Sequence, residues 1–259
     1  MDNLKSNSIG TSSYQSPEGA ESYMHYIESE DAATFMPVLT EAILARLGNN
    51  REAFILDGGC GPGWLAGALA ETGRMNVYGC DASTLLIEAA RKKYQRVKFE
   101  IVDFTQTLPY NEGQFDYIIL SMAVVALDLE RQIKTFQNMF KALKPNGHLI
   151  FVTVNPYYGY PVGVWKRGLW GFLFRKKPKL KLRPYQDCVR SKNRDFVWNQ
   201  NLISYFYTLS EQVNALLKIG FSLDYLQEIA SETDSSSYNL RYRLYRYPIF
   251  LLLDFKKTV

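Results

Sequence analysis

The sequence predicts an α/β fold with a doubly wound, seven-stranded, mainly parallel sheet. From residue 54 onward, short apolar segments of strand character alternate with segments of helical periodicity. A glycine-rich turn joins the first of these strands to the helix after it. Strands separated by helices of about 10 to 15 residues form right-handed crossovers, and these build a parallel sheet that is covered on both faces.

The expected elements follow in chain order. The first twenty residues are rich in Ser, Asn and Gly and predict a flexible arm, and residues 21–48 predict a helix that ends at Gly48. Strands are then expected at residues 53–57, 76–81, 97–103, 114–121 and 147–155. Helices are expected at residues 64–72, 83–93 and 130–144, with Ser83 as an N-cap. A helix at 208–221 and two strands at 222–229 and 247–257 complete the chain, and these strands predict an antiparallel C-terminal hairpin at the sheet edge.

These elements divide the chain into four segments. Residues 1–50 are the flexible arm and a helical cap, and residues 51–154 are the core of the fold. Residues 155–207 interrupt the alternation as an inserted lid, and residues 208–259 complete the core sheet.

Composition restricts the class of protein. The chain has 259 residues, of which 47% are hydrophobic, and its apolar runs are far shorter than the ~18 to 20 residues of a membrane helix. The amino end lacks the basic start and apolar core of a secretory signal, so we expect a cytoplasmic protein. Cys60, Cys80 and Cys188 show no metal-binding spacing, and we expect them to be buried small residues.

A glycine-rich loop carries the main functional signal. Residues 54–64 read FILDGGCGPGW, in which an apolar run ends at Asp57 and leads through four glycines. Glycine lets backbone amides approach a ligand closely because it has no Cβ. A dinucleotide-binding loop requires G-x-G-x-x-G, and Trp64 stands where the last glycine is needed. The loop therefore disfavours NAD.

The pattern acidic-x-Gly-x-Gly-x-Gly, from Asp57 to Gly63, resembles motif I of the class I S-adenosylmethionine-dependent methyltransferases with a Rossmann-like fold. Cys80-Asp81-Ala82-Ser83, Val102-Asp103-Phe104, LPY, QFDYIILS and LKPNG follow in the order of that family, and its small-molecule branch is the closest. The resemblance implies that S-adenosylmethionine is the cofactor and S-adenosylhomocysteine the product. It also implies that Asp81 accepts hydrogen bonds from the ribose hydroxyls and Asp103 one from the adenine amino group. The implied cofactor-binding set is Asp57, Gly58, Gly59, Gly61, Asp81, Ala82, Asp103, Phe104 and Ser121.

A sulfonium already activates its methyl group, so alignment of the acceptor can supply most of the catalysis. His25, in the first helix, is the candidate general base, with an ordinary helix-surface histidine as the alternative. His148 begins the fifth strand at the end remote from a ligand crevice. Tyr14 and Tyr23 are candidates to cover the cofactor, because an aromatic face attracts a sulfonium. No Asp, Glu or His cluster has metal-ligand spacing, so we expect a metal-independent reaction.

The insert at 155–207 is the candidate lid over the acceptor, with Tyr157, Tyr158 and Trp165 among its aromatic residues. It holds 11 basic and two acidic residues, a balance of +9 against −5 for the rest of the chain, which together give the net charge of +4. This charge is interpreted as a solvated face, as a clamp for an anionic acceptor, or as a membrane-surface contact. Asn155-Pro156-Tyr157-Tyr158 is similar to the Asn-Pro-Pro-Tyr signature of methyltransferases that act on amino groups of nucleobases. That signature follows the fourth strand, whereas this stretch follows the fifth, so nucleic acid is not expected as a partner.

The function expected from the sequence is methyl transfer to an O, N or C nucleophile of a small organic molecule, such as an anionic or aromatic specialised metabolite. Two alternatives stay open. One is a lipid or quinone methyltransferase at a membrane surface, and the other is a non-catalytic scaffold that binds S-adenosylmethionine. The acceptor and the oligomeric state are left undetermined by the sequence.

Overall fold

The computed structural model describes residues 14, 16–155, 193–194, 203–205, 207–230 and 248–258. Its central feature is a seven-stranded sheet with the strand order β3-β2-β1-β4-β5-β9-β8. The strands are β1 (Phe54–Gly58), β2 (Asn76–Asp81), β3 (Lys98–Ile101), β4 (Phe115–Ser121), β5 (Leu143–Val154), β8 (Phe221–Ile229) and β9 (Phe250–Lys257). The first five are parallel, and β9 runs antiparallel to both β5 and β8. The predicted mixed sheet with an antiparallel hairpin at its edge is confirmed.

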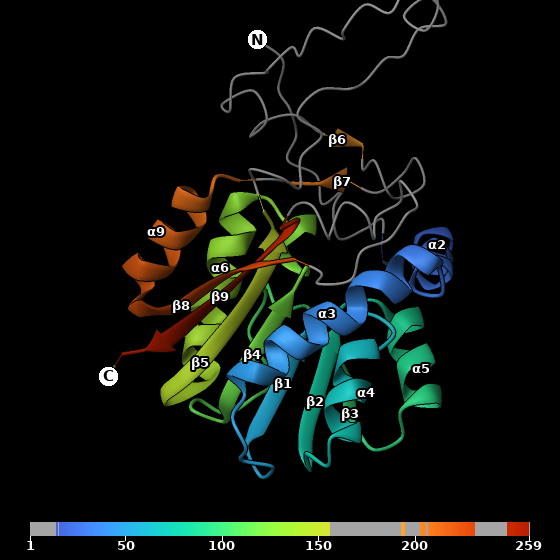
Figure 1. Ribbon diagram of the computed structural model, residues 1–259, viewed down its shortest axis with the longest axis horizontal. Coiled ribbons are helices and arrows are strands. Elements are labelled where there is room, and N and C mark those ends of the chain that lie inside the picture. The colour runs from blue at the N-terminus through green and yellow to red at the C-terminus, as the bar shows by residue number, and fades with distance from the viewer. Residues whose placement is uncertain are drawn as a thin grey trace, which may run out of the picture.

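Helices cover both faces of this sheet (Figure 1). They are α2 (Pro17–Ile27), α3 (Glu30–Arg46), α4 (Trp64–Glu71), α5 (Thr84–Lys93), α6 (Leu129–Ala142) and α9 (Leu209–Ile219), with a short 3₁₀ turn η1 (Val124–Ala126). Apolar residues of α3, α4 and α5 form one core layer, whereas residues of α6 and α9 form the layer on the opposite face. Within the described residues, no helix combines the length and the apolar character that crossing a bilayer requires.

The amino-terminal helical segment differs from the expectation in two ways. The helix begins at Pro17, inside the segment expected to be a flexible arm, because the Ser16 side chain accepts a hydrogen bond from the Gly19 N–H and caps it. The expected single helix is also broken after Ile27. Ser29 has an extended backbone and caps α3 by accepting from the Ala32 N–H, so α2 and α3 are separate helices.

Two other sequence expectations have clear outcomes. Ser83 occupies the N-cap position of α5, as predicted, but its hydroxyl makes no capping hydrogen bond. Cys60 and Cys80 are buried free thiols, as expected, and Cys188 lies outside the described residues. Burial raises the pKa of Cys80 to about 12, which keeps this thiol protonated and unreactive at neutral pH.

A buried ionic network ties α3 to the carboxyl-terminal strands. Arg46 donates through Nε to Asp254 Oδ2 at 2.9 Å, and its Nη2 lies 3.0 Å from Asp224 Oδ2. Asp254 is fully buried and also contacts His148 Nδ1 at 2.8 Å. The network therefore neutralises the buried Asp254 carboxylate of β9, a strand that lies between β5 and β8.

We expect Asp254→Ala to destabilise the fold by about 3 to 5 kcal/mol, because it strands the partly buried Arg46 guanidinium without its inner partner. Asp224→Ala is the matched control. It removes the exposed partner of the same guanidinium and should cost under about 1 kcal/mol. Urea denaturation of both variants measures the difference, and equal losses would contradict this account of the network.

Candidate active site

The turn from β1 into α4 can be made only with glycine. Gly59, Gly61 and Gly63 have φ angles of +71°, +54° and +82°, in the left-handed region that side chains disfavour. A Cβ on Gly59 would lie 2.5 Å from the Cβ of Ala123, and one on Gly61 would lie 2.7 Å from the ring of Tyr23. The backbone of the turn is therefore packed directly against neighbouring segments.

Asp57 connects the end of β1 to the first turn of α4. Its side chain is 2% exposed, and its Oδ2 accepts a hydrogen bond from the Ala66 N–H at 3.2 Å. Burial raises the pKa of Asp57 to about 7; the hydrogen bond from Ala66 opposes this shift, and the nearby charge of Asp81 adds to it. A buried carboxyl that titrates near neutrality lies beneath the glycine loop.

Asp81 ends β2 and faces the same loop. Its Oδ2 accepts from the Gly61 N–H at 3.0 Å, and its Oδ1 accepts from the Ser83 N–H at 2.9 Å. Burial raises the pKa of Asp81, and the backbone N–H groups of Ser83, Gly61 and Ala82 partly offset this. A carboxylate offers about four acceptor positions, so acceptor capacity remains beyond these bonds.

Asp103 and Phe104 follow β3. Asp103 Oδ1 accepts from the backbone N–H of Thr105 at 2.9 Å and from its hydroxyl at 2.7 Å, which forms a local turn. Phe104 is buried, its ring lies against Gly59, and its carbonyl accepts from Asn138 Nδ2 at 3.0 Å. The structure thus brings Phe104 to the glycine loop.

The end of β4 supplies the fourth side of the site. The Ser121 hydroxyl is buried and has no hydrogen-bond partner among the described residues. Met122, next to it, has a φ of +57°, an uncommon angle for a residue with a side chain, while its N–H donates to Val152 O at 3.0 Å. This strained residue sets the position of Ala123 against Gly59, and no sequence pattern indicated it.

Helix α2 brings one of the three candidates from the amino-terminal segment, Tyr23, to the loop. The ring of Tyr23 lies over Gly61, and Tyr14 contacts it edge-on with the ring centroids 5.6 Å apart. Burial, with the charges of Tyr14 and Asp81 as lesser causes, raises the pKa of Tyr23, so its hydroxyl stays protonated. His25 is exposed and lies two residues from Tyr23, a spacing that does not share a helix face. The structure does not bring His25 to the glycine loop.

The described part of the lid segment meets the same edge of the sheet. The Tyr205 N–H donates to Val125 O at 2.6 Å, and the Tyr207 hydroxyl accepts from the Leu129 N–H at 2.7 Å. These contacts join the end of the segment to η1 and to the start of α6. Tyr157, Tyr158 and Trp165 lie outside the described residues.

The sequence spacing gave no sign of one cluster that could ligate a metal. His148, Asp224 and Asp254 place one ligand atom each within 4.8 Å of one another. Arg46 already donates to both carboxylates, and the cluster lies among α3, β5, β8 and β9 rather than at the glycine loop. Asp116, at the start of β4, likewise pairs within the fold, accepting from the Phe54 N–H and from Lys144 Nζ, both at 2.8 Å.

The electrostatics of the glycine loop favour a cationic ligand. Asp57 and Asp81 are both held in a buried setting that raises their pKa values, and neither forms an ion pair with a described basic residue. The Ser83 and Ser121 hydroxyls, at the ends of neighbouring segments, also lack partners among the described residues. A ligand with positive charge and hydrogen-bonding groups would satisfy both deficits, and S-adenosylmethionine fits this description.

Comparison with known proteins gives the family. The profile of a family described as "Methyltransferase domain" matches residues 55–147, from β1 into the first half of β5. Residues 55–147 of the chain are therefore a methyltransferase domain. The match covers the glycine loop, Asp81, Asp103 and Ser121 in one continuous segment.

Two curated relatives are similar to part of this chain. The chain is 30% identical over 114 residues to a malonyl-[acyl-carrier protein] O-methyltransferase of Enterobacter lignolyticus, which covers 44% of each protein. It is 26% identical over 176 residues to a phosphoethanolamine N-methyltransferase of Plasmodium falciparum, covering 66% of this chain and 65% of that protein. The chain thus spans about half to two thirds of the length of these relatives.

Solved structures show the same fold. A crystal structure of an S-adenosylmethionine-dependent methyltransferase from Mesorhizobium loti aligns with a TM-score of 0.62 and 24% identity, covering 87% of this chain and 99% of that one. A magnesium protoporphyrin IX methyltransferase from Synechocystis PCC 6803, solved with bound SAH, aligns with a TM-score of 0.61 and 16% identity over 96% of this chain and 98% of that one. The α/β architecture of the methyltransferase domain is therefore shared well beyond residues 55–147.

The titration of Asp57 predicts a pH-dependent stability. An unfolded Asp titrates near ~3.9, whereas folded Asp57 titrates at about 7. Between these values the folded chain holds a proton that the unfolded chain has released, so the free energy of unfolding falls as pH rises through this window. We expect this residue to contribute a loss on the order of a few kcal/mol, measured by urea denaturation from pH 4 to pH 8. Asp57→Asn cannot ionise and should lose this contribution, and an unchanged pH slope in the variant would contradict the assignment.

Proposed function

We propose that this chain transfers the methyl group of S-adenosylmethionine to an O, N or C nucleophile of a small organic molecule. The observation that carries the proposal is a pair of carboxyl groups, the buried Asp57 and the half-buried Asp81, that form no ion pair with a described basic residue and lie beside a glycine turn whose backbone packs too closely for side chains. The curated relatives named as an O-methyltransferase and an N-methyltransferase support methyl transfer but differ in acceptor. The acceptor is therefore left to an experimental screen.

Each residue of the site has a proposed role. Asp81 accepts from the ribose hydroxyls with the acceptor positions that Gly61 and Ser83 leave open. Asp57, Gly58, Gly59, Gly61 and Ala82 form the floor of the cofactor site. At its sides, Asp103 and Phe104 hold the adenine, and Ser121 offers its unpartnered hydroxyl to the methionine end.

When bound, S-adenosylmethionine supplies a methyl group that its sulfonium already activates. The chain then has three tasks, which are to bind, to orient the acceptor and to exclude water. Orientation alone can supply effective molarities on the order of 10⁵ to 10⁸ M. Tyr23 and Tyr14 are proposed to cover the loop and exclude water, because the Tyr23 ring already lies on Gly61. Its protonated hydroxyl makes Tyr23 a hydrogen-bond donor rather than a base.

The lid remains a proposal that rests on its described end. Tyr205 and Tyr207 join residues 155–207 to the segment that follows Ser121, at the edge of the sheet where the carboxyl ends of β1, β2 and β4 meet. We propose that the +9 balance of this segment attracts an anionic acceptor.

The direct test is calorimetry with S-adenosylmethionine and S-adenosylhomocysteine on the purified chain, with NAD as a control, followed by an acceptor screen that detects S-adenosylhomocysteine. Saturable binding of the first two compounds without NAD binding supports the cofactor. Failure of both to bind would refute the proposal. Binding without turnover on any acceptor would favour a scaffold.

Asp81→Ala should weaken S-adenosylhomocysteine binding at least tenfold, because it removes the bidentate acceptor for the ribose. Glu88→Ala, on the exposed side of α5, removes the same charge a few residues away and should bind like the unmodified chain. Calorimetry compares the two variants, and circular dichroism checks that both stay folded. Equal affinities would remove Asp81 from the site.

A further inference from the structure

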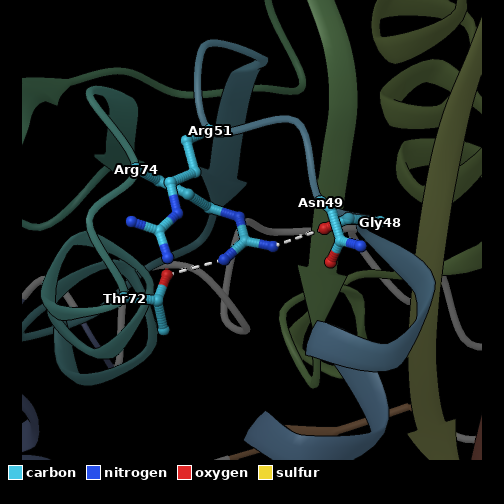
Figure 2. A pocket seen from close by; sticks show the side chains of 5 residues that line it. All are labelled: Gly48, Asn49, Arg51, Thr72 and Arg74. Carbon is cyan, nitrogen blue, oxygen red and sulfur yellow. Dashed lines mark hydrogen bonds between the residues drawn. The ribbon is translucent and has the colours of Figure 1, made fainter.

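A second group of unpaired charges lies at the amino end of the sheet, opposite the glycine loop. The loop between α3 and β1 contributes Gly48, Asn49 and Arg51, and the turn after α4 contributes Thr72 and Arg74. These five residues line a pocket of about 230 Å³ (Figure 2). One water needs only ~10 to 15 Å³ by a comparable measure, so the pocket has room for a polyatomic ligand.

Arg74 is held in a fixed orientation within this pocket. Its Nη1 donates to the Thr72 hydroxyl at 2.6 Å, and its Nη2 donates to Gly48 O at 2.9 Å, as Figure 2 shows. Its Nε is buried and has no hydrogen-bond partner among the described residues. Two bonds therefore immobilise the guanidinium plane and use two of its five N–H donors, so three donors, the buried Nε–H among them, are left over.

No carboxylate neutralises either arginine of the pocket within the described chain. The ion pairs there use Arg46, Arg131, Lys144 and His148 instead. Glu52 and Glu71 are neighbours in sequence, yet neither pairs with Arg51 or Arg74 within the described residues. Burial and then the positive charge of Arg51 lower the pKa of Arg74, and Tyr117 opposes this shift.

The carboxyl end of α4 explains only part of this arrangement. Thr72 is the C-cap of α4, and a helix C-terminus favours a nearby cation. Arg51 lies close to this end of the helix. Its Nη1 would be only 3.2 Å from a Cβ placed on Gly73, the residue after Thr72. However, the Arg51 guanidinium makes no described hydrogen bond to the α4 carbonyls or to any other group. A second, unbonded cation beside Arg74 therefore needs another reason.

We propose that the pocket between Arg51 and Arg74 binds the phosphate group of an anionic ligand. Guanidinium groups present planar, always-charged donors that match phosphate oxygens. The Asn49 side chain lines the same pocket and can add a neutral donor. The site lies where β1 and β2 begin, whereas the glycine loop lies where they end, so this ligand is distinct from the methyl acceptor.

The test uses the full chain and inorganic phosphate as the probe. Calorimetric titration at constant ionic strength, set with sodium chloride, should show saturable binding. Arg51→Gln should weaken phosphate binding at least tenfold. The Arg51 side chain is exposed, so this substitution should leave the fold intact. Arg96→Gln is the matched control, because Arg96 is also exposed and has no described ion pair. It should bind phosphate like the unmodified chain.

Three results would overturn the proposal. They are no saturable binding by the unmodified chain, equal affinities in all three proteins, or equal losses in both variants, which would show only general charge attraction. S-adenosylhomocysteine binding should be unchanged in Arg51→Gln, so that a failure here is distinct from a failure of the cofactor assignment.

A second pair of measurements separates the sources of the phosphate group. Glycerol 3-phosphate tests a soluble phosphomonoester, and flotation with phosphatidic acid vesicles tests a lipid headgroup. Binding that depends on Arg51 in the first measurement identifies a soluble ligand, and such binding in the second identifies a membrane lipid. Binding in either measurement that Arg51→Gln leaves unchanged would contradict the pocket as its site.

Discussion

The hydrogen bond from the Ala66 N–H to Asp57 Oδ2 is the contact on which the site depends. It joins the end of β1 to the first turn of α4, and the chain between them must reverse direction within a few residues. That reversal requires the left-handed backbone of Gly59, Gly61 and Gly63. Once the turn is made, its N–H groups face Cys80 and Asp81 at the end of β2. The position of every other part of the site follows from this turn.

The packing around the turn explains why so many small residues meet there. Ala123 and Phe104 press on Gly59, and Tyr23 presses on Gly61, so each neighbouring segment contacts backbone rather than side chain. These residues lie just after β4, just after β3 and in α2, which are far apart in sequence. A larger side chain at any of these contacts would separate the strands from the helix that covers them. The turn is therefore a packing junction of the core as well as the proposed cofactor site.

Charge is distributed unevenly between the two edges of the sheet. At the carboxyl edge, the buried Asp57 and the half-buried Asp81 have no described basic partner. At the amino edge, Arg51 and Arg74 face a pocket without a described acidic partner. Desolvation penalises the buried Asp57 and, to a lesser degree, the half-buried Asp81 and Arg74, whereas Arg51 is exposed. Unpaired charge of opposite sign at the two edges is the arrangement expected of two sites for ligands of opposite charge.

The sequence by itself determined the fold class, the strand and helix order and the glycine loop, because these depend on local periodicity and on the backbone freedom of glycine. It also indicated Asp57, Asp81 and Phe104, since each lies at or just after the carboxyl end of a strand, at the edge where parallel strands end together. Tertiary structure alone decided the break at Ser29, the exposed face of His25 and the unused hydroxyl of Ser83, because these depend on which surface each helix packs against. The pairing of Arg46 with Asp254 and the juxtaposition of Arg51 with Arg74 were likewise decided only there. Each joins residues from separate loops or elements, and no local pattern encodes the distance between them.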